Sequence, residues 1–366
     1  MSDLIVTSIT PTLGSGTGLR TYGVTAALAR HHPVEVAYQV WGAEEPAVEY
    51  GRLGPVTLRA THASRGPARG LAYLRTLALG GTMRIAQGVS PELAGSAGAC
   101  AENVRVIADG MVAAAALLPL ARTREVVYLA HNLESSGFRG QSQAARLEGF
   151  ERRVLREFSE SWMATRADER GAHALAGDEI STRYVPNVVD GAAIEPVRPA
   201  GRRRLLFVGD FRYPPNLEAF KFLTDAVLPT VWRRIPDARL TAVGRGLPEA
   251  SRGPRIETPG FVDELADAYR TADIVLVPLL RGGGSPLKFV EGLAYGLPVV
   301  ATQHAARLIE DGVPGRDFLA ADGATEFAQA IEGLLVDPGR AAAIGAAGRE
   351  LAIRGHSIDA LARLIT

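Results

Sequence analysis

The stretch of residues 273–302, DIVLVPLLRGGGSPLKFVEGLAYGLPVVAT, predicts a strand, a triple-glycine turn, a helix and a second strand. Glycines between a strand and a helix let backbone N–H groups approach a ligand closely, and the helix N-terminus adds about half a positive charge. Together these features suit a diphosphate. Lys288 and Glu291 stand three positions apart, so they share one helix face, with the cation nearer the glycine turn. A carboxylate there can accept hydrogen bonds from two vicinal hydroxyls, such as those of a ribose.

The same alternation of short apolar runs and helix-periodic stretches continues through both halves of the chain. Strands are expected at residues 4–9, 34–40, 104–108, 126–130 and 161–164, and in the second half at 204–208, 239–243, 274–277 and 299–302. Helices are expected between them, among others at residues 18–30, 68–79, 111–121 and 144–158. Strands and helices that alternate in this way form parallel sheets covered by helices on both faces. The sequence therefore predicts an α/β protein with two Rossmann-like domains that face each other across a cleft.

A segment rich in proline and glycine at residues 185–201 marks the expected boundary between the two domains. The length of 366 residues also favours two domains, because one domain commonly holds about 100–200 residues. We predict an N-terminal domain at residues 1–190, a C-terminal domain at 191–352 and a terminal helix at 353–366.

The composition is that of an ordinary globular protein, with 47% hydrophobic and 22% charged residues. Forty basic residues balance forty acidic ones, so the net charge gives no argument for nucleic acid or an anionic membrane as the main partner. No uncharged apolar stretch approaches the roughly 18 residues of a transmembrane helix, and the first residues lack signal-peptide features. The single cysteine, Cys100, excludes an internal disulfide and a cysteine-based zinc site. We therefore expect a cytoplasmic protein without stable membrane insertion and without a metal site. The sequence does not indicate its oligomeric state.

Two further segments of the second half follow expected strands, and open α/β sheets bind ligands at the carboxyl ends of their strands. VGDFRYPPN, at residues 208–216, contains Arg212, whose guanidinium either bridges two phosphate oxygens or is an exposed turn residue. Asn216, at its end, is expected to cap the next helix. Phe261 and Val262 belong to the second segment, where Phe261 either lies beside a ligand or is buried in packing.

A glycine-rich turn, GSGTG at residues 14–18, follows the first strand and opens a helix that is expected to begin just after it. A nicotinamide-binding unit would need an acidic residue about twenty positions on, where Gln39 and Trp41 stand instead. The turn around Gly16 therefore either approaches a different ligand or is a structural loop. Arg20, near the start of that helix, is expected to be solvated.

His131 and Asn132 directly follow the strand expected at residues 126–130. At this position the histidine Nε2 or a backbone carbonyl can meet a hydroxyl of a ligand or a developing positive charge. The alternative is a structural loop histidine. Asp109, at the end of the preceding strand, either meets a hydroxyl of a second substrate or caps the following helix.

These segments resemble the retaining glycosyltransferases of the GT-B fold, often called glycosyltransferase family 4. That family includes sucrose synthase-like, glycogen synthase-like and phosphatidylinositol mannosyltransferase enzymes. The resemblance is strongest over residues 205–302, extends more weakly to His356 and is weakest between residues 40 and 103. It implies a C-terminal domain that binds a nucleotide-sugar, an N-terminal domain on the acceptor side, and a terminal helix that returns to the N-terminal domain.

The resemblance also implies roles for single residues. The triple-glycine turn would cradle the donor diphosphate, Lys288 would bind its oxygens, and Glu291 would hold the ribose. The residues implied in catalysis are Lys288, Arg212 and His131, and those implied in donor binding are Glu291, Gly283, Gly284, Ser285, Phe261, Val262 and Gly16.

One departure concerns the E-x(7)-E pair that many members of the family carry. Gly283 stands eight residues before Glu291, where the first glutamate of the pair would lie near the donor sugar. The phosphate and ribose sites do not depend on that glutamate. Its absence leaves the identity of the sugar open, and the nucleotide base is open as well.

The function implied is metal-independent transfer, with retention, of a sugar from a nucleotide-diphosphate donor to a hydroxyl acceptor, without a further cofactor. No basic amphipathic helix is expected in the N-terminal half, so a soluble acceptor such as a specialised metabolite or a small glycoside is favoured. Two alternatives stay open: a nucleotide-sugar epimerase of similar fold, and a non-catalytic partner subunit that binds a nucleotide-sugar.

Overall fold

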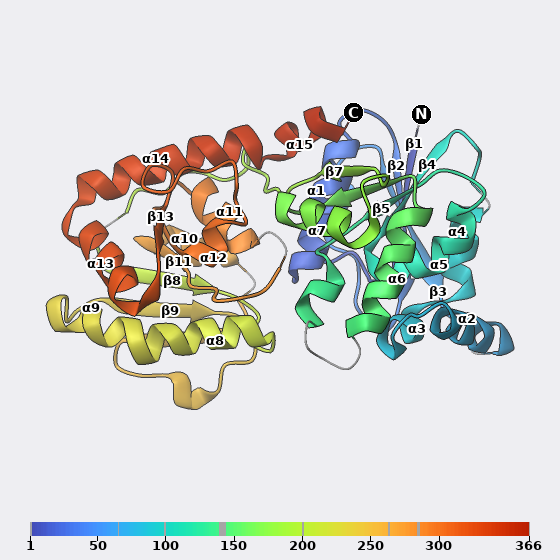
Figure 1. Ribbon diagram of the computed structural model, residues 1–366. Coiled ribbons are helices and arrows are strands. Elements are labelled where there is room, and N and C mark those ends of the chain that lie inside the picture. The colour runs from blue at the N-terminus through green and yellow to red at the C-terminus, as the bar shows by residue number, and fades with distance from the viewer. Residues whose placement is uncertain are drawn as a thin grey trace. The chain divides into compact units, whose positions relative to one another are not determined.

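A computed structural model describes residues 2–365, except residues 65, 99, 139–143, 200, 263 and 284–285. The chain forms two compact units (Figure 1). The first runs to Asn187 and also includes Gly283 and the residues from Leu361 onward. The second begins at Val188 and contains the remaining residues.

The first unit is a seven-stranded sheet in which every neighbouring pair of strands is parallel. Its strand order is β3 (Val56–His62), β2 (Val34–Val40), β1 (Ser2–Thr7), β4 (Val104–Asp109), β5 (Val126–Leu129), β6 (Glu160–Met163) and β7 (Thr182–Tyr184). Its helices are α1 (Gly16–Leu28), α2 (Pro67–Ala78), α3 (Met83–Gly88), α4 (Pro91–Gly98), α5 (Gly110–Ala121), α6 (Ala144–Glu157) and α7 (Arg166–Ala176), with short helical turns η1 (Val48–Arg52) and η2 (Glu134–Phe138).

The second unit is a six-stranded sheet that is again parallel throughout. Its strand order is β10 (Ile256–Gly260), β9 (Arg239–Val243), β8 (Arg204–Val208), β11 (Ile274–Val277), β12 (Val299–Thr302) and β13 (Leu319–Ala321). The helices are α8 (Pro214–Phe222), α9 (Leu228–Arg234), α10 (Leu265–Arg270), α11 (Leu287–Ala294), α12 (Gln303–Ala306), α13 (Gly323–Val336) and α14 (Pro338–Gly355), with η3 (Leu223–Val227) and η4 (Glu249–Ser251). The last helix, α15 (Ile358–Ile365), begins in this unit, and its residues from Leu361 onward belong to the first. Figure 1 shows α8 and α9 on one face of this sheet and α11 and α14 on the other.

Both sheets contain a point where the strand order reverses. In the first unit this point lies between β1 and β4, and in the second it lies between β8 and β11. Helices that follow the two adjacent strands leave on opposite sides there, which opens a crevice at the carboxyl ends of the strands. The predicted fold class, α/β with two Rossmann-like units, is confirmed.

The sequence predicted the central strands and missed the edge strands. The four strands for which it gave no residue range are β3, β7, β10 and β13, which form the two edges of each sheet. Edge strands have one side free of hydrogen-bonded neighbours, so they are shorter or more polar than the buried runs of a parallel sheet. In β3, for example, no residue is buried, and Thr57 and Arg59 are exposed.

Two helices differ from expectation. Helix α1 begins at Gly16, inside the glycine turn, because the side chain of Ser15 caps it by accepting a hydrogen bond from Gly18 N at 3.1 Å. Helix α2 carries Arg69 and Arg75 and exposes Leu71 and Leu74, which are 69% and 62% accessible to solvent. The expectation that the N-terminal half lacks a basic amphipathic helix is therefore wrong. No helix among the described residues is long and apolar enough to cross a membrane.

Candidate functional site

Lys288 and Asn216 meet at the point where the strand order of the second sheet reverses. Lys288 lies in α11, which follows β11, and Asn216 lies in α8, which follows the adjacent strand β8. The Nζ of Lys288 donates a hydrogen bond to Asn216 Oδ1 at 2.7 Å and lies 4.8 Å from the centre of the Phe207 ring. Asn216 is not the helix cap that the sequence predicted, because α8 begins at Pro214 and the Asn216 amide donates to Asp210 O. Its side chain instead holds the lysine at the crevice.

The environment of Lys288 destabilises its charge. Burial lowers the pKa of Lys288 to about 7, against a smaller opposing effect of Glu291. The chain contains only two lysines, Lys221 and Lys288, among its 40 basic residues. At this position the chain has a compact ammonium, whose pKa shifts readily, whereas all but one of its other basic residues are arginines. An anionic ligand would restore the full charge.

Glu291 lies one turn further along α11 and is held by a tyrosine. The hydroxyl of Tyr269 donates to Glu291 Oε2 at 2.8 Å, and the Tyr269 ring stacks on Tyr295 with centroids 4.5 Å apart. Burial raises the pKa of Glu291, while the Tyr269 hydrogen bond and the charge of Lys288 act in the opposite direction. The Tyr269 hydroxyl occupies Oε2, so the other carboxylate oxygen, Oε1, is the atom that can accept from a ligand hydroxyl.

Two glycines let the ends of β8 and β9 lie against this pair. A Cβ atom on Gly209 would lie 3.1 Å from Lys288 Nζ, and one on Gly244 would lie 1.7 Å from the Gly209 carbonyl oxygen. Gly244 also has a φ of 142°, a region that residues with side chains rarely adopt. Each of these glycines follows a valine at a strand end, in VGD and VGR, and the sequence alone indicated the strand end but not the close approach.

Arg212 and Phe261 lie near the ends of β8 and β10. The exposed guanidinium of Arg212 is paired with Asp210 of the same turn, with Nε 2.9 Å from Oδ1 and Nη2 2.5 Å from Oδ2. Phe261 is 48% exposed, so the alternative that it is buried in packing is wrong. The Arg245 guanidinium carbon covers its ring at 4.2 Å from the centroid, whereas Val262 packs against the core of the unit.

The glycine-rich turn is described only in part. Gly283 is described, whereas Gly284 and Ser285 lie outside the described residues. Gly282 has a φ of 115°, so the backbone just before the predicted cradle requires glycine. His304 Nε2 lies 2.8 Å from the Gly282 carbonyl oxygen, which ties this end of the turn to α12.

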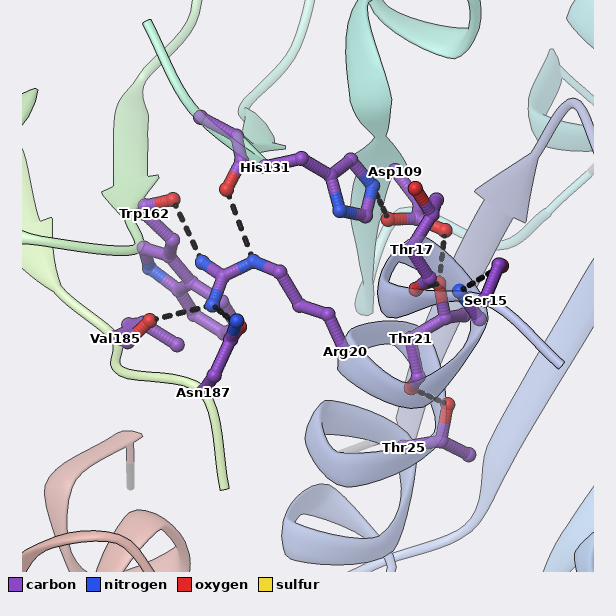
Figure 2. A network of polar contacts seen from close by, with 12 residues as sticks. Ser15, Thr17, Arg20, Thr21, Thr25, Asp109, His131, Trp162, Val185 and Asn187 are labelled. Atoms are coloured by element: carbon purple, nitrogen blue, oxygen red, sulfur yellow. Dashed lines mark hydrogen bonds and ion pairs between the residues drawn. The ribbon is translucent and has the colours of Figure 1, made fainter. Parts of the chain in front are cut away.

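The first unit brings His131 and Asp109 together at the ends of β5 and β4 (Figure 2). His131 Nε2 lies 2.9 Å from Asp109 Oδ1, although the two groups are not aligned for an ideal hydrogen bond. The Asp109 side chain does not cap α5, so that alternative is wrong. Because Nε2 faces Asp109, a ligand would meet His131 at Nδ1 or at its backbone carbonyl.

Arg20 is buried rather than solvated, with 2% of its surface exposed. Its Nε donates to Ala130 O at 3.0 Å, and its Nη1 donates to Val185 O at 2.8 Å and to Asn187 Oδ1 at 2.9 Å. Burial lowers the pKa of Arg20 to about 10, and Asp109 opposes this effect. Because the helix starts at Gly16, Arg20 lies a full turn inside it, which the sequence alone did not reveal.

Comparisons with known proteins agree with this geometry. Residues 202–337 match the family described as "Glycosyl transferases group 1". Over 179 residues the chain is 32% identical to phosphatidyl-myo-inositol mannosyltransferase from Mycolicibacterium smegmatis, a stretch that covers 45% of this chain and 45% of that relative. The matching stretch thus spans less than half of the relative. Lys288, Glu291, Arg212 and Phe261 all lie inside the family match.

Solved structures resemble the chain over nearly its whole length. Sucrose-phosphate synthase from Thermosynechococcus elongatus has a TM-score of 0.75 at 18% identity, with 99% of this chain and 96% of that chain covered. Anabaena HepE in complex with UDP and glucose has a TM-score of 0.73 at 14% identity, with 100% and 98% covered. The chain has the GT-B fold. At these identities the likeness to the GT-B structures concerns the fold alone.

Proposed function

We propose that the chain is a glycosyltransferase that moves a sugar from a nucleotide-diphosphate donor to a hydroxyl acceptor. The observation that carries this proposal is the Lys288–Asn216 pair at the strand-order reversal of the second sheet, inside the segment that matches glycosyl transferases group 1. A buried ammonium in such a crevice is stabilised when an anion binds beside it. The N-terminus of α11 also favours a negatively charged ligand.

The donor would bind with its diphosphate at Lys288 and at the glycine-rich turn of Gly283, Gly284 and Ser285. Glu291 would accept from the ribose hydroxyls, since Tyr269 already fixes its orientation. Arg212 would add a second cation after exchanging its partner Asp210 for a phosphate oxygen. The base would lie near Phe261 and Val262.

The chemistry that this arrangement suits is transfer with retention and without a metal. The bond between the anomeric carbon and the β-phosphate oxygen breaks, and the bond to the acceptor oxygen forms on the same face of the sugar. The acceptor proton passes to the departing β-phosphate, so no protein nucleophile is needed. Lys288 and Arg212 would stabilise the charge that grows on the leaving diphosphate. His131 would contact the sugar from the first unit, and Gly16 would approach the donor phosphate.

The acceptor has two candidates. The sequence favoured a soluble hydroxyl compound, such as a specialised metabolite or small glycoside, because no basic amphipathic helix was expected. Helix α2 is such a helix, so this argument for a soluble acceptor no longer holds. A lipid-linked acceptor is favoured by the exposed Leu71, Leu74 and Met83, with the exposed Arg75 among them. Residues 50–91 contain no acidic residue, and the similar mycobacterial enzyme is by name a phosphatidylinositol mannosyltransferase. Measuring kcat/KM with acceptors in solution and with acceptors embedded in anionic vesicles separates the two candidates. A lipid-linked acceptor is supported if only the vesicle-bound acceptors are glycosylated.

Substitution of Lys288 tests the proposed function. A single good contact to a developing oxyanion contributes about 3–4 kcal/mol, so Lys288→Ala should lower kcat at least about a hundredfold. Lys221→Ala is the matched control, because it removes the other lysine of the chain from an exposed position of α8. Activity of Lys288→Ala within a few-fold of wild type would contradict the proposal. Isomerised nucleotide-sugar without an acceptor would identify an epimerase, and binding without turnover would identify a non-catalytic subunit.

A further inference from the structure

The carboxylate of Asp109 is a fixed anion at the strand-order reversal of the first sheet. Its side chain is fully buried, and Thr21 Oγ1 of α1 donates a hydrogen bond to Oδ2 at 2.7 Å. Burial alone would raise the pKa of Asp109, but His131, Thr21 and Thr7 together hold it below its ordinary value. The carboxylate therefore keeps its charge and position, with Oδ1 directed to the imidazole of His131 (Figure 2).

The imidazole fits against Asp109 only because the next residue is glycine. Gly110 has a φ of 79°, in the left-handed region, and a Cβ atom there would lie 3.2 Å from His131 Cδ2. The ring of His131, with 16% of its side chain exposed, lies over this glycine. Nε2 and Cδ2 thus face the protein, and Nδ1 is the ring nitrogen on the opposite edge.

Helix α1 secures both the main chain and the ring of His131 through consecutive residues. Arg20 donates to the carbonyl oxygen of Ala130, the residue directly before His131. Thr21 holds the carboxylate that faces the ring. Both residues lie in the helix that the glycine-rich turn opens, so one helix holds both the main chain before His131 and the carboxylate that faces its ring.

We propose that Asp109 is the positioning residue of His131, which it holds as the tautomer with the proton on Nε2. Nδ1 then carries the free lone pair and accepts a hydrogen bond from a hydroxyl of the sugar substrate. This role rests on the proposed glycosyltransferase function. From the sequence alone, Nε2 or the backbone carbonyl of His131 was expected to contact the ligand, and Asp109 was a candidate to contact the acceptor hydroxyl. The proposal instead gives the ligand contact to Nδ1 and a positioning role to Asp109.

Other ionisable groups face the same pair from several elements. Arg20 of α1 is the nearby cation, and Tyr50 of η1 and Tyr128 of β5 both experience the charge of Asp109. Glu134 of η2 experiences the charge of His131. Substitution of Asp109 changes the field that acts on all of them, so the test must observe His131 itself.

Selective ¹⁵N labelling of histidine tests the positioning role directly. The protein has seven histidines, and His131→Gln assigns the signal of interest by difference. We expect Nε2 protonated and Nδ1 unprotonated in neutral His131 of the wild type, and a loss of this preference in Asp109→Asn, because the adjacent anion is lost. A neutral ring with the proton on Nδ1 in the wild type, or the same tautomer preference in Asp109→Asn, would overturn the proposal.

Kinetics supply the second arm of the test. Asp109→Asn should lower kcat at least about tenfold, because the side chain that contacts the reacting sugar loses its orientation, with the donor KM within about threefold of wild type. Thr21→Val should lower kcat in the same direction, and Thr21→Ser should restore it, because serine keeps the hydroxyl. Equal kcat values for these folded variants and the wild type would refute the positioning role. A wild type without turnover would instead contradict the proposed function, and the NMR result would still decide the role of Asp109.

Discussion

At the scale of single residues, the lowered pKa of Lys288 predicts that donor binding takes up a proton. Its pKa is lowered to about 7, so the ligand-free side chain is mostly neutral at about pH 8. A bound diphosphate stabilises the ammonium, so nucleotide-sugar binding at this pH should take up about one proton, and uptake should vanish as the pH falls through about 6. Calorimetry in buffers of different ionisation enthalpy measures it. Lys288→Met should bind without proton uptake, and Lys221→Met should behave like the wild type.

The Tyr269–Glu291 hydrogen bond gives a second prediction. Tyr269→Phe removes the donor at 2.8 Å, so the pKa of Glu291, already raised by burial, should rise further. A protonated carboxyl accepts poorly from ribose hydroxyls, so the donor Kd should increase more at about pH 6 than at about pH 8. Donor titrations at both pH values check this. An equal loss at both values would mean that the tyrosine acts by packing alone.

The sequence predicted some of the site residues and missed others for a physical reason. Lys288 and Glu291 were found because their spacing in one helix is a local property. The partners Asn216 and Tyr269 come from other βα units, so only the folded sheet brings them close. Asp109 was placed at the correct strand end, but its neighbour in space was not predictable without the tertiary structure.

At the scale of elements, the sequence predicted those strands that are buried on both faces of a sheet. Central strands such as β8 and β11 are apolar on both faces, so they stand out as continuous hydrophobic runs. Edge strands such as β3 and β10 are partly exposed, and β10 even contains Pro259. The start of α1 was placed too late because a cap such as Ser15 was not recognised within a glycine-rich stretch.

The turn after β8 gives a prediction at this scale. Gly209→Ala should separate Lys288 from Asn216, because the added Cβ atom would lie 3.0 Å from the Asn216 side chain and 3.1 Å from Lys288 Nζ. We expect donor affinity to fall about tenfold, equivalent to about 1.4 kcal/mol, in a protein that still folds. Gly253→Ala is the control, since a Cβ atom there meets nothing within 4 Å. Equal affinity of the two variants would show that the turn does not set the position of the lysine.

At the scale of the whole molecule, each unit places polar groups where its strand order reverses. The second unit has Lys288 and Asn216 there, and the first has Asp109 and Thr21. In open α/β sheets this place binds ligands because strand ends and helix N-termini converge on it. The proposed donor site therefore lies at the strand-order reversal of the second unit.

Donor binding without added metal tests the central claim most directly. The thermal unfolding of the protein would be followed with a panel of nucleotide-sugars in the presence of a chelator, for the wild type, Lys288→Ala, Glu291→Ala and Lys221→Ala. A ligand at a hundred times its Kd stabilises a protein by about 2.7 kcal/mol, so at least one donor should raise the Tm of the wild type and of Lys221→Ala by a few degrees. The shift should be clearly smaller for Lys288→Ala and Glu291→Ala. If no nucleotide-sugar shifts the wild type, or if all four proteins shift equally, the proposed donor site is wrong.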